Sequence, residues 1–325
     1  MTGAFVHTIA SMGTVVTIHV VGDGANHVDQ VERKHIVERA IAWFDEIERV
    51  CSRFDPHSEV SRLSTRIGAS VRVSDLLFEA VQFALAVAEE SGGAFDPTLG
   101  LLLEEHGFNH EHRSGAVVRT PLERDAAASY RDVRLDVDER AIMLARPLVL
   151  DLGAVAKGLA VDMAARELKG KSFDDFAIDA GGDLYLAGCN ADGKPWSVGI
   201  RHPRDGKELF EILRVSNVAV CTSGDYERRT RSGGAGAEHH IIDPRTEASA
   251  SASASVTVLA PSAMVADALA TAAFVLGPAD GLDLLEHHGV DGLIITPALE
   301  QFATRGMRDR LSRGTSLAPN SSRDS

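Results

Sequence analysis

The chain has 325 residues, of which 44% are hydrophobic and 25% are charged. This composition is typical of a folded globular protein and excludes disorder over most of the length, which suffices for one large domain or two closely packed lobes. The formal net charge of −14 disfavours nucleic acid or an anionic membrane surface as a general partner. An anionic substrate would therefore need local help from a bound cation, from glycine-rich backbone turns or from a few placed Lys and Arg side chains.

The cysteines and the N-terminus bear on the cellular location. Cys51, Cys189 and Cys221 are an odd, widely spaced set, which predicts neither a disulfide framework nor a zinc site. The N-terminus lacks the pattern of a signal peptide or lipobox, and no segment has 18 uninterrupted apolar residues. We therefore expect a cytoplasmic protein without stable membrane insertion, provided that this N-terminus is the native one.

The first part of the chain predicts one strand followed by helices. Residues 13–22 alternate β-branched and polar side chains, which is typical of a half-buried strand. Apolar residues over 37–54 keep the spacing of one buried helix stripe, and Pro56 ends that helix. Ser74 offers an N-cap for a second, mostly buried helix that stops before two glycines.

The second part of the chain is rich in strands. A short buried strand at 147–151 is predicted to lead into a helix over about 154–169, and two further helices begin near 262 and 279, followed by a strand at 292–296. Other strands, separated by Gly, Pro, Asn and Asp, are predicted at 176–186, 196–201, 209–215, 218–222, 239–242 and 255–260. Because strands and helices do not alternate regularly, we predict an α+β fold with mixed or antiparallel sheets and packed helices.

The expected domain organisation is simple. Residues 1–314 form a single domain, either undivided or built as two intimately associated lobes with the ligand site between them, and residues 315–325 form a disordered polar tail.

Asp267 and Thr271 suggest a divided magnesium site. They are four residues apart in a stretch that favours helix, so a carboxylate and a hydroxyl project from one face about a turn apart. Mg²⁺ binds such hard oxygens, takes few of them from the protein and completes its octahedron with water and substrate phosphates. An Asp and a Thr on a solvated helix face would have the same spacing, so the pattern alone leaves both interpretations open.

Three other segments carry polar groups that suit an anionic ligand. The turn after Asp151 places glycine and exposed N–H groups at a strand-to-helix junction, and Lys157 follows within reach, although a solvated lysine would look the same. The glycine turn at 179–183 is either a bulge or a close approach of backbone to a ligand. His240, three residues before Asp243, is either structural or catalytic.

The combination and order of the segments are more specific than any one of them. The segments are Met12–Thr14, Ser52–Leu63, Gly93–Thr98, the Asp151 junction, Gly181–Asp183, Thr222–Tyr226, His240–Pro244 and Asp267–Thr271. In this order they resemble the FAD:protein FMN transferase family, also called ApbE-like flavin transferases. The resemblance covers most of the chain.

The resemblance implies an activity. Members of that family use Mg²⁺ to cleave the pyrophosphate of FAD, move the FMN half onto a Thr or Ser hydroxyl of a target protein as a phosphoester, and release AMP. We therefore expect an ApbE-like fold, FAD as substrate, Mg²⁺ as cofactor and an acceptor protein or peptide as partner. An FAD pyrophosphatase that uses water as acceptor and a flavin carrier without catalysis remain as alternatives.

The resemblance also assigns roles to residues. Asp267 and Thr271 would ligate the metal with side-chain oxygens, and Ala154 with its backbone carbonyl. His240 would help to activate the acceptor hydroxyl, a role suited to an imidazole. Glu247 stands where relatives often have Gly, which puts the shape of that turn in doubt.

The flavin and nucleotide would be held by a separate group of side chains. Phe54 offers a ring that could stack on the ligand, although its place on the predicted helix stripe suits a core role as well. The full set implied by the resemblance is Met12, Phe54, Ala94, Phe95, Asp96, Asp151 and Lys157.

Overall fold

The computed structural model describes residues 4–24, 28–229 and 238–315. The expected tail at 315–325 lies outside the described residues except for Thr315, which ends helix α8 (Arg305–Thr315). Within these ranges, no helix is long and apolar enough to cross a membrane.

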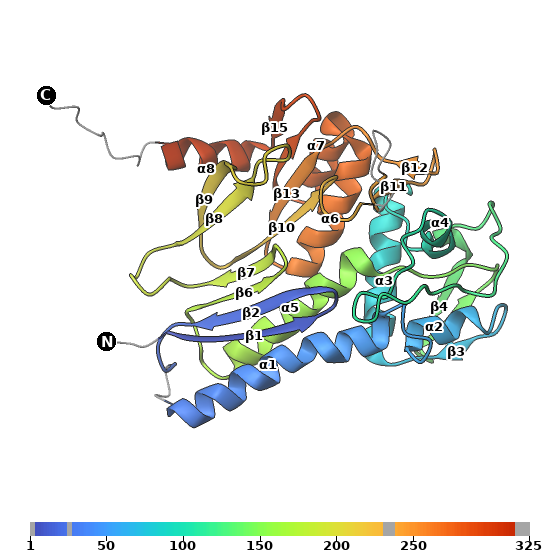
Figure 1. Ribbon diagram of the computed structural model, residues 1–325, viewed down its shortest axis with the longest axis horizontal. Coiled ribbons are helices and arrows are strands. Elements are labelled where there is room, and N and C mark those ends of the chain that lie inside the picture. The colour runs from blue at the N-terminus through green and yellow to red at the C-terminus, as the bar shows by residue number, and fades with distance from the viewer. Residues whose placement is uncertain (1–3, 25–27, 230–237, 316–325) are drawn as a thin grey trace, which may run out of the picture.

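An eight-stranded sheet forms the centre of the molecule, and every neighbouring pair of its strands is antiparallel (Figure 1). Its strands, in spatial order, are β1 (Phe5–Ser11), β2 (Thr14–Val20), β6 (Phe176–Ala180), β7 (Asp183–Ala187), β10 (Val218–Gly224), β13 (Ser255–Ala260), β14 (Asp291–Ile295) and β15 (Gln301–Ala303).

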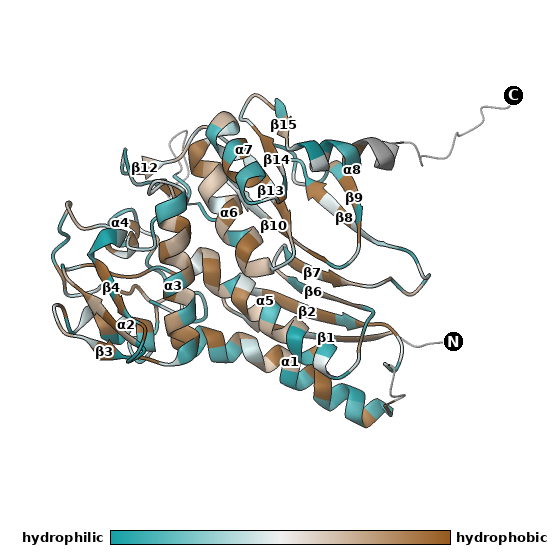
Figure 2. Ribbon diagram, turned by 180° about the vertical axis from the view of Figure 1, so that it is seen from behind, coloured by the Kyte–Doolittle hydropathy of each residue, from teal (hydrophilic) through white to brown (hydrophobic). Residues whose placement is uncertain are grey.

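Helices cover one face of this sheet and bury the main hydrophobic core against it. They are α1 (Gln30–Cys51), α3 (Asp75–Glu90), α5 (Gly153–Gly170), α6 (Ala263–Leu276) and α7 (Pro278–His287). Seen from behind, α1 carries alternating hydrophilic and hydrophobic bands, as a helix with one buried face should (Figure 2). The α+β prediction is confirmed.

The opposite face of the sheet has a smaller core of its own. The hairpin of β8 (Trp196–Arg201) and β9 (Leu209–Val215), together with α8, packs over that face. The strand alternation shows how one strand serves both cores: in β10, Ala219 and Cys221 face the helices, whereas Val220 faces the hairpin.

A peripheral region lies to the right in Figure 1. It holds the short strands β3 (Val71–Arg72), β4 (Val133–Asp136) and β5 (Ala141–Leu144), with α2 (Glu59–Ser64), α4 (Gly100–Glu105) and the 3-10 turn Tyr130–Asp132. The two-residue strands β11 (Ile242–Asp243) and β12 (Ala248–Ser249) pair separately.

Several predicted elements differ from the structure. Residues 147–151 make only an isolated bridge between Val149 and Leu99, because this stretch is a short connection whose Asp151 N–H bonds to the carbonyl of Pro97. The predicted strand at 239–242 shrinks to β11, since His239 makes an isolated bridge with Arg229 instead.

The first helix also ends early. It stops at Cys51, and the Ser52 hydroxyl then accepts a hydrogen bond from Phe54 N (3.3 Å), which turns the chain. Phe54 therefore lies beyond the helix stripe and belongs to neither hydrophobic core.

Candidate active site

The close crossing of α5 and α6 forms the base of the candidate site. A Cβ on Gly158 of α5 would lie 2.5 Å from the backbone of Ala263, so glycine is required for this approach. Asp162, one turn further along α5, accepts hydrogen bonds from the Ser262 hydroxyl (2.6 Å) and from the N–H groups of Ala263 (2.7 Å) and Met264 (3.0 Å). Its carboxylate thus caps the N-terminus of α6 and fixes how the two helices meet.

Lys157 bridges two buried carboxylates next to this crossing. Its Nζ lies 3.0 Å from Asp267 Oδ2 on α6 and 2.7 Å from Asp183 Oδ2 at the start of β7. Asp183 and Asp267 are 4% and 5% exposed, which excludes a solvated helix face for Asp267. The strand alternation explains the position of Asp183, because Tyr185 and Ala187 of the same strand also face the helices.

The electrostatics of this cluster favour a cation. Burial and the charge of Asp183 raise the pKa of Asp267 to about 6, against the attraction of Lys157. Burial alone would lower the pKa of Lys157, but Asp183 and Asp267 together hold it above its ordinary value. One ammonium group therefore serves two buried carboxylates, and a negative charge is left over.

Thr271 and Ala154 are the other two residues predicted to bind the metal with Asp267. Thr271 lies one turn beyond Asp267, and its hydroxyl is 3.1 Å from the hydroxyl of Ser223 on β10. Ala154 is in the first turn of α5, whose Gly153 carbonyl lies 3.4 Å from Lys157 Nζ. No group of three or more His, Cys, Asp or Glu side chains in the described ranges could hold a metal ion, so a cation here needs hydroxyl, carbonyl or ligand oxygens.

Arg53 holds Asp151 at the start of α5. Its side chain is 4% exposed, its Nε donates to Asp151 Oδ2 (2.5 Å), and its Nη2 donates to the carbonyl of Phe108 (2.5 Å). Asp151 also accepts from Gly153 N (2.8 Å). Burial would raise the pKa of Asp151, but Arg53 and this N–H group hold it below its ordinary value, so the carboxylate is ionised.

Phe54 lies on the other side of the same guanidinium. The centre of its ring is 4.2 Å from Arg53 Cζ, a cation–π contact that leaves the half-buried ring outside the core. Arg53 Nη1 is buried and has no hydrogen-bond partner among the described residues.

The run from Ala94 to Asp96 lies next to the Asp151 junction. Ala94 and Phe95 are buried in the main core, and the Asp96 carboxylate accepts from the N–H (2.8 Å) and hydroxyl (2.6 Å) of Thr98. Burial raises the pKa of Asp96 despite these bonds. The hydrogen bond from Asp151 N to the carbonyl of Pro97 (2.8 Å) places this run beside the Asp151 junction.

Met12 lies in the turn between β1 and β2. It has a φ of +51° in the connection between β1 and β2, and its side chain packs against the main core. A Cβ on Gly181 would lie 2.0 Å from Thr14 Oγ1, so this connection packs closely on the glycine turn that precedes Asp183.

His239 and His240 point to different surroundings. His239 is buried, with Nε2 2.9 Å from the carbonyl of Ala250 and its ring against Phe274. His240 is half-buried and packs edge-on against Phe108, and its buried Nδ1 has no hydrogen-bond partner in the described part of the chain. Burial, followed by the charges of Arg228 and its other neighbours, lowers the pKa of His240 to about 3, so the imidazole is neutral at neutral pH.

Glu247, which stands where relatives often have Gly, lies in the turn after β11. Glu247 adopts a φ of +57°, the conformation that glycine takes without strain. Its N–H bonds to the carbonyl of Asp243 (2.8 Å), and its carboxylate accepts two hydrogen bonds from Arg124 (2.9 and 3.0 Å).

The structure adds residues that the sequence did not single out as ligands. Asp183 and Ser223 belong to segments that carried the resemblance, and their signal was a polar side chain on the helix-facing side of a strand. Arg53 has no spacing signal, because its partner Asp151 lies far away in the sequence, and no sequence pattern marks Arg228, whose charge acts on His240.

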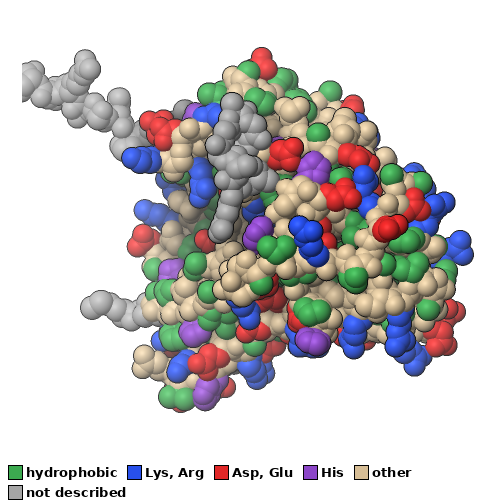
Figure 3. Space-filling view, turned by 45° about the vertical axis from the view of Figure 1, so that its right-hand side comes forward, with side chains coloured by type: hydrophobic (Ala, Val, Ile, Leu, Met, Phe, Trp, Pro, Cys, Tyr) green, Lys and Arg blue, Asp and Glu red, His purple; other side chains and the backbone are tan. Residues whose placement is uncertain are grey.

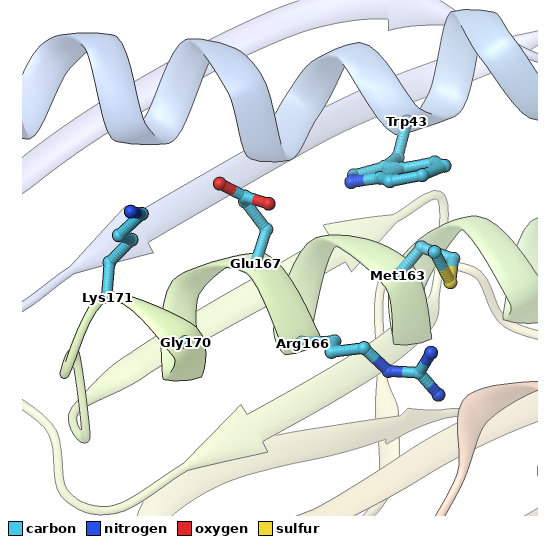
Figure 4. Close-up of a pocket in the computed structure, with 6 residues that line it drawn as sticks. All are labelled: Trp43, Met163, Arg166, Glu167, Gly170 and Lys171. Carbon is cyan, nitrogen blue, oxygen red and sulfur yellow. The ribbon is translucent and has the colours of Figure 1, made fainter.

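Two features of the described surface lie outside the site. Basic and acidic side chains are interspersed over the face seen in Figure 3, despite the net charge of −14. A groove of about 260 Å³ between α1 and α5 includes no predicted site residue (Figure 4). It is lined by Trp43, Met163, Arg166, Glu167, Gly170 and Lys171.

Comparison with known proteins adds independent information. The model of the ApbE family matches residues 12–294. The FAD:protein FMN transferase of Treponema pallidum is 33% identical over 293 residues, which cover 85% of this chain and 81% of that protein. The crystal structure of the ApbE protein from Thermotoga maritima superposes with a TM-score of 0.82 at 29% identity, covering 95% of this chain and 99% of that one. The flavin transferase ApbE from Vibrio cholerae gives a TM-score of 0.81 at 26% identity, covering 96% and 100%.

Proposed function

Because this chain belongs to the ApbE family, we propose that it transfers FMN from FAD to a Thr or Ser hydroxyl of an acceptor protein and releases AMP, with Mg²⁺ as cofactor. The observation that carries the proposal is the buried cluster of Lys157, Asp183 and Asp267 at the crossing of α5 and α6. A flavin carrier without catalysis has little use for two buried carboxylates that share a single ammonium group.

The donor set fits a hard divalent cation. Asp267 supplies an anionic oxygen, Thr271 a hydroxyl one turn away, and the first turn of α5, where Ala154 lies, supplies backbone carbonyls. The negative charge left over in the cluster favours a cation there. When bound, Mg²⁺ would neutralise charge on the diphosphate.

The chain's own residues would do the remaining work. The N–H groups at the start of α5 suit phosphate oxygens, and Asp151 keeps that helix end in place through Gly153. The ring of Phe54 would stack on the ligand. We further infer that residues 1–314 act as one domain, since α5 and α6 share a core with the sheet.

His240 is the proposed proton acceptor. The acceptor hydroxyl oxygen bonds to the phosphorus of the FMN half, the bond from that phosphorus to the bridging oxygen breaks, and the electron pair leaves with AMP. The hydroxyl proton passes to His240, which is neutral and can accept it. A pKa of about 3 makes His240 a weak base, which suits a loose transition state that needs little base assistance.

The decisive experiment is incubation of the protein with FAD, Mg²⁺ and a threonine-containing acceptor peptide. We expect mass spectrometry to find one added FMN on the peptide, with an equal amount of AMP, and neither product in the presence of a chelator. AMP formation without peptide modification would mean an FAD pyrophosphatase. Recovery of intact FAD in the presence of Mg²⁺ would mean a carrier, and either result would overturn the proposal.

A further inference from the structure

Arg228 lies beside His240 in the fold. It follows β10 in the chain, and its carbonyl accepts a hydrogen bond from His240 N (3.2 Å). The next residue, Arg229, forms an isolated antiparallel bridge with His239. The two arginines are therefore held by backbone contacts next to the two histidines.

The two arginines differ in what their side chains do. The Arg229 side chain turns to Asp225, donating from Nε to its carbonyl (2.8 Å) and lying 3.8 Å from its carboxylate. Asp225 also pairs with Arg204 at 2.7 and 2.8 Å. The exposed guanidinium of Arg228 makes no hydrogen bond or ion pair with any residue in the described ranges.

The charge of Arg228 nevertheless reaches the candidate site. Burial is the largest influence on the pKa of Asp151, which it raises, and on the pKa of His240, which it lowers, and the charge of Arg228 lowers both. Asp151 and His240 come from separate parts of the chain, so Arg228 lies near the place where they meet.

The charge balance of the site depends on this arginine. Asp151, Asp183 and Asp267 are three acidic groups, and Arg53, Lys157 and Arg228 are three basic ones. Arg53 and Lys157 are already engaged with carboxylates, whereas Arg228 pairs with no carboxylate among the described residues and its whole guanidinium is open to a ligand. A guanidinium presents parallel N–H donors that match two phosphate oxygens.

We propose that Arg228 is a further catalytic residue, whose guanidinium binds the diphosphate of FAD. The proposal rests on the proposed transferase function. As the bond between the FMN phosphorus and the bridging oxygen breaks, the electron pair goes to that oxygen, and Arg228 stabilises the growing negative charge without giving up its proton.

The test compares Arg228→Gln with Arg229→Gln. The two positions are adjacent, exposed and of like charge, but only Arg229 is engaged with Asp225. In single-turnover transfer at saturating FAD, we expect a loss of about 10²–10³-fold for Arg228→Gln and a change of less than about threefold for Arg229→Gln. Arg228→Lys, which keeps the charge but not the two parallel donors, should fall between them. Equal rates for Arg228→Gln and the parent would overturn the proposal.

A binding measurement separates this proposal from the transferase function itself. Arg228→Gln should weaken binding of FAD and leave binding of riboflavin, which has no phosphate, unchanged. Equal weakening for both ligands would mean that Arg228 does not contact phosphate. This comparison needs no acceptor, so it decides the role of Arg228 even if the parent protein yields no FMN adduct.

The pKa of His240 offers a third test, which can be measured on the protein without ligand. Removing the charge of Arg228 should raise the pKa of His240 in an NMR titration, whereas Arg229→Gln should leave it where it is. An unchanged His240 pKa in Arg228→Gln would show that the guanidinium points away from the site, and the proposal would fail.

Discussion

The two sides of the candidate site differ in how their polar groups are satisfied. On the side of α5, α6 and β7, the ammonium group of Lys157 bonds to both Asp183 and Asp267. On the loop side, Arg53 Nη1 and His240 Nδ1 are buried without a partner among the described residues. Both residues contact Phe108, Arg53 at the Phe108 carbonyl and His240 at the Phe108 ring.

This difference indicates which side waits for the substrate. A buried polar group without a partner costs about 1–3 kcal/mol, so two of them on residues that contact Phe108 are expected where a substrate supplies the missing contacts. The helix side is instead preorganised and carries surplus negative charge, which suits a cation. The comparison therefore predicts that changes on the helix side abolish metal dependence, whereas changes on the loop side affect the ligand and the proton.

The largest effect is expected on the helix side, from Asp267→Asn. The change conserves volume but replaces an anionic oxygen by a neutral amide, which weakens a hard-cation site. We expect Mg²⁺-dependent transfer to fall by about 10⁴-fold or more, with the parental melting temperature retained. Asp280→Asn, at an exposed position of α7, is the control. Parental transfer by a folded Asp267→Asn protein would refute the metal assignment, and failure to fold would make Asp267 structural.

The next effect tests the loop side, with His240→Ala. A positioned base contributes about 10²–10⁴-fold, and the low pKa of His240 places the expected loss at the lower end, near 10²-fold, with FAD binding nearly unchanged. His239→Ala should reduce stability through its lost contacts with Ala250 and Phe274 but leave the rate per folded molecule close to the parent's. Equal single-turnover losses at both positions, or none at His240, would remove the base assignment.

The sequence predicted those features that local patterns determine. The strands at 196–201, 209–215 and 255–260 were predicted at their observed bounds, because alternation and flanking turn residues are contained within each segment. The position of Asp267 and Thr271 on one face of a helix was predicted in the same way, from helical spacing alone, whereas their role as metal ligands stays a prediction.

The remaining features depend on contacts that no local pattern contains. Lys157 and Asp267 are 110 residues apart, and Arg53 and Asp151 are 98 apart, so only the packed fold brings them together. Strands β3 to β5 have two to four residues each, too few to show a period. The early end of α1 depends on one hydroxyl, that of Ser52, which competes with the helix for Phe54 N.

Phe54→Ala tests whether the ring beside Arg53, on the loop side of the site, stacks on the ligand. If the ring stacks on the ligand, FAD binding should weaken by about 1–3 kcal/mol, and the parent should bind FAD more tightly than FMN because the adenylate half is also gripped. Phe302→Ala, at a ring that is 38% exposed on β15, is the matched control. Unchanged FAD affinity in Phe54→Ala would limit the ring to its contact with Arg53, and equal affinities for FAD and FMN would favour a simple carrier.

The smallest effect is a pH dependence of stability that originates at His240. Its pKa is about 3 in the folded protein and about 6.5 in an unfolded chain, so between these values the unfolded state binds the additional proton. The folded state is therefore fully favoured at neutral pH, and this contribution is lost progressively as the pH falls from about 6.5 to about 3.

Between pH 7.5 and 5.5 this loss amounts to about 1.4 kcal/mol of the free energy of unfolding. His240→Gln cannot take up that proton, so its denaturant-unfolding free energy should fall less than the parent's over the same interval, by about this amount. His239→Gln tests the neighbour, whose pKa burial also lowers. If the parent and His240→Gln show parallel pH profiles, the imidazole is already solvated and hydrogen-bonded in the free protein. The loop side would then not be waiting for a ligand, and the contrast between the two sides of the site would rest on Arg53 alone.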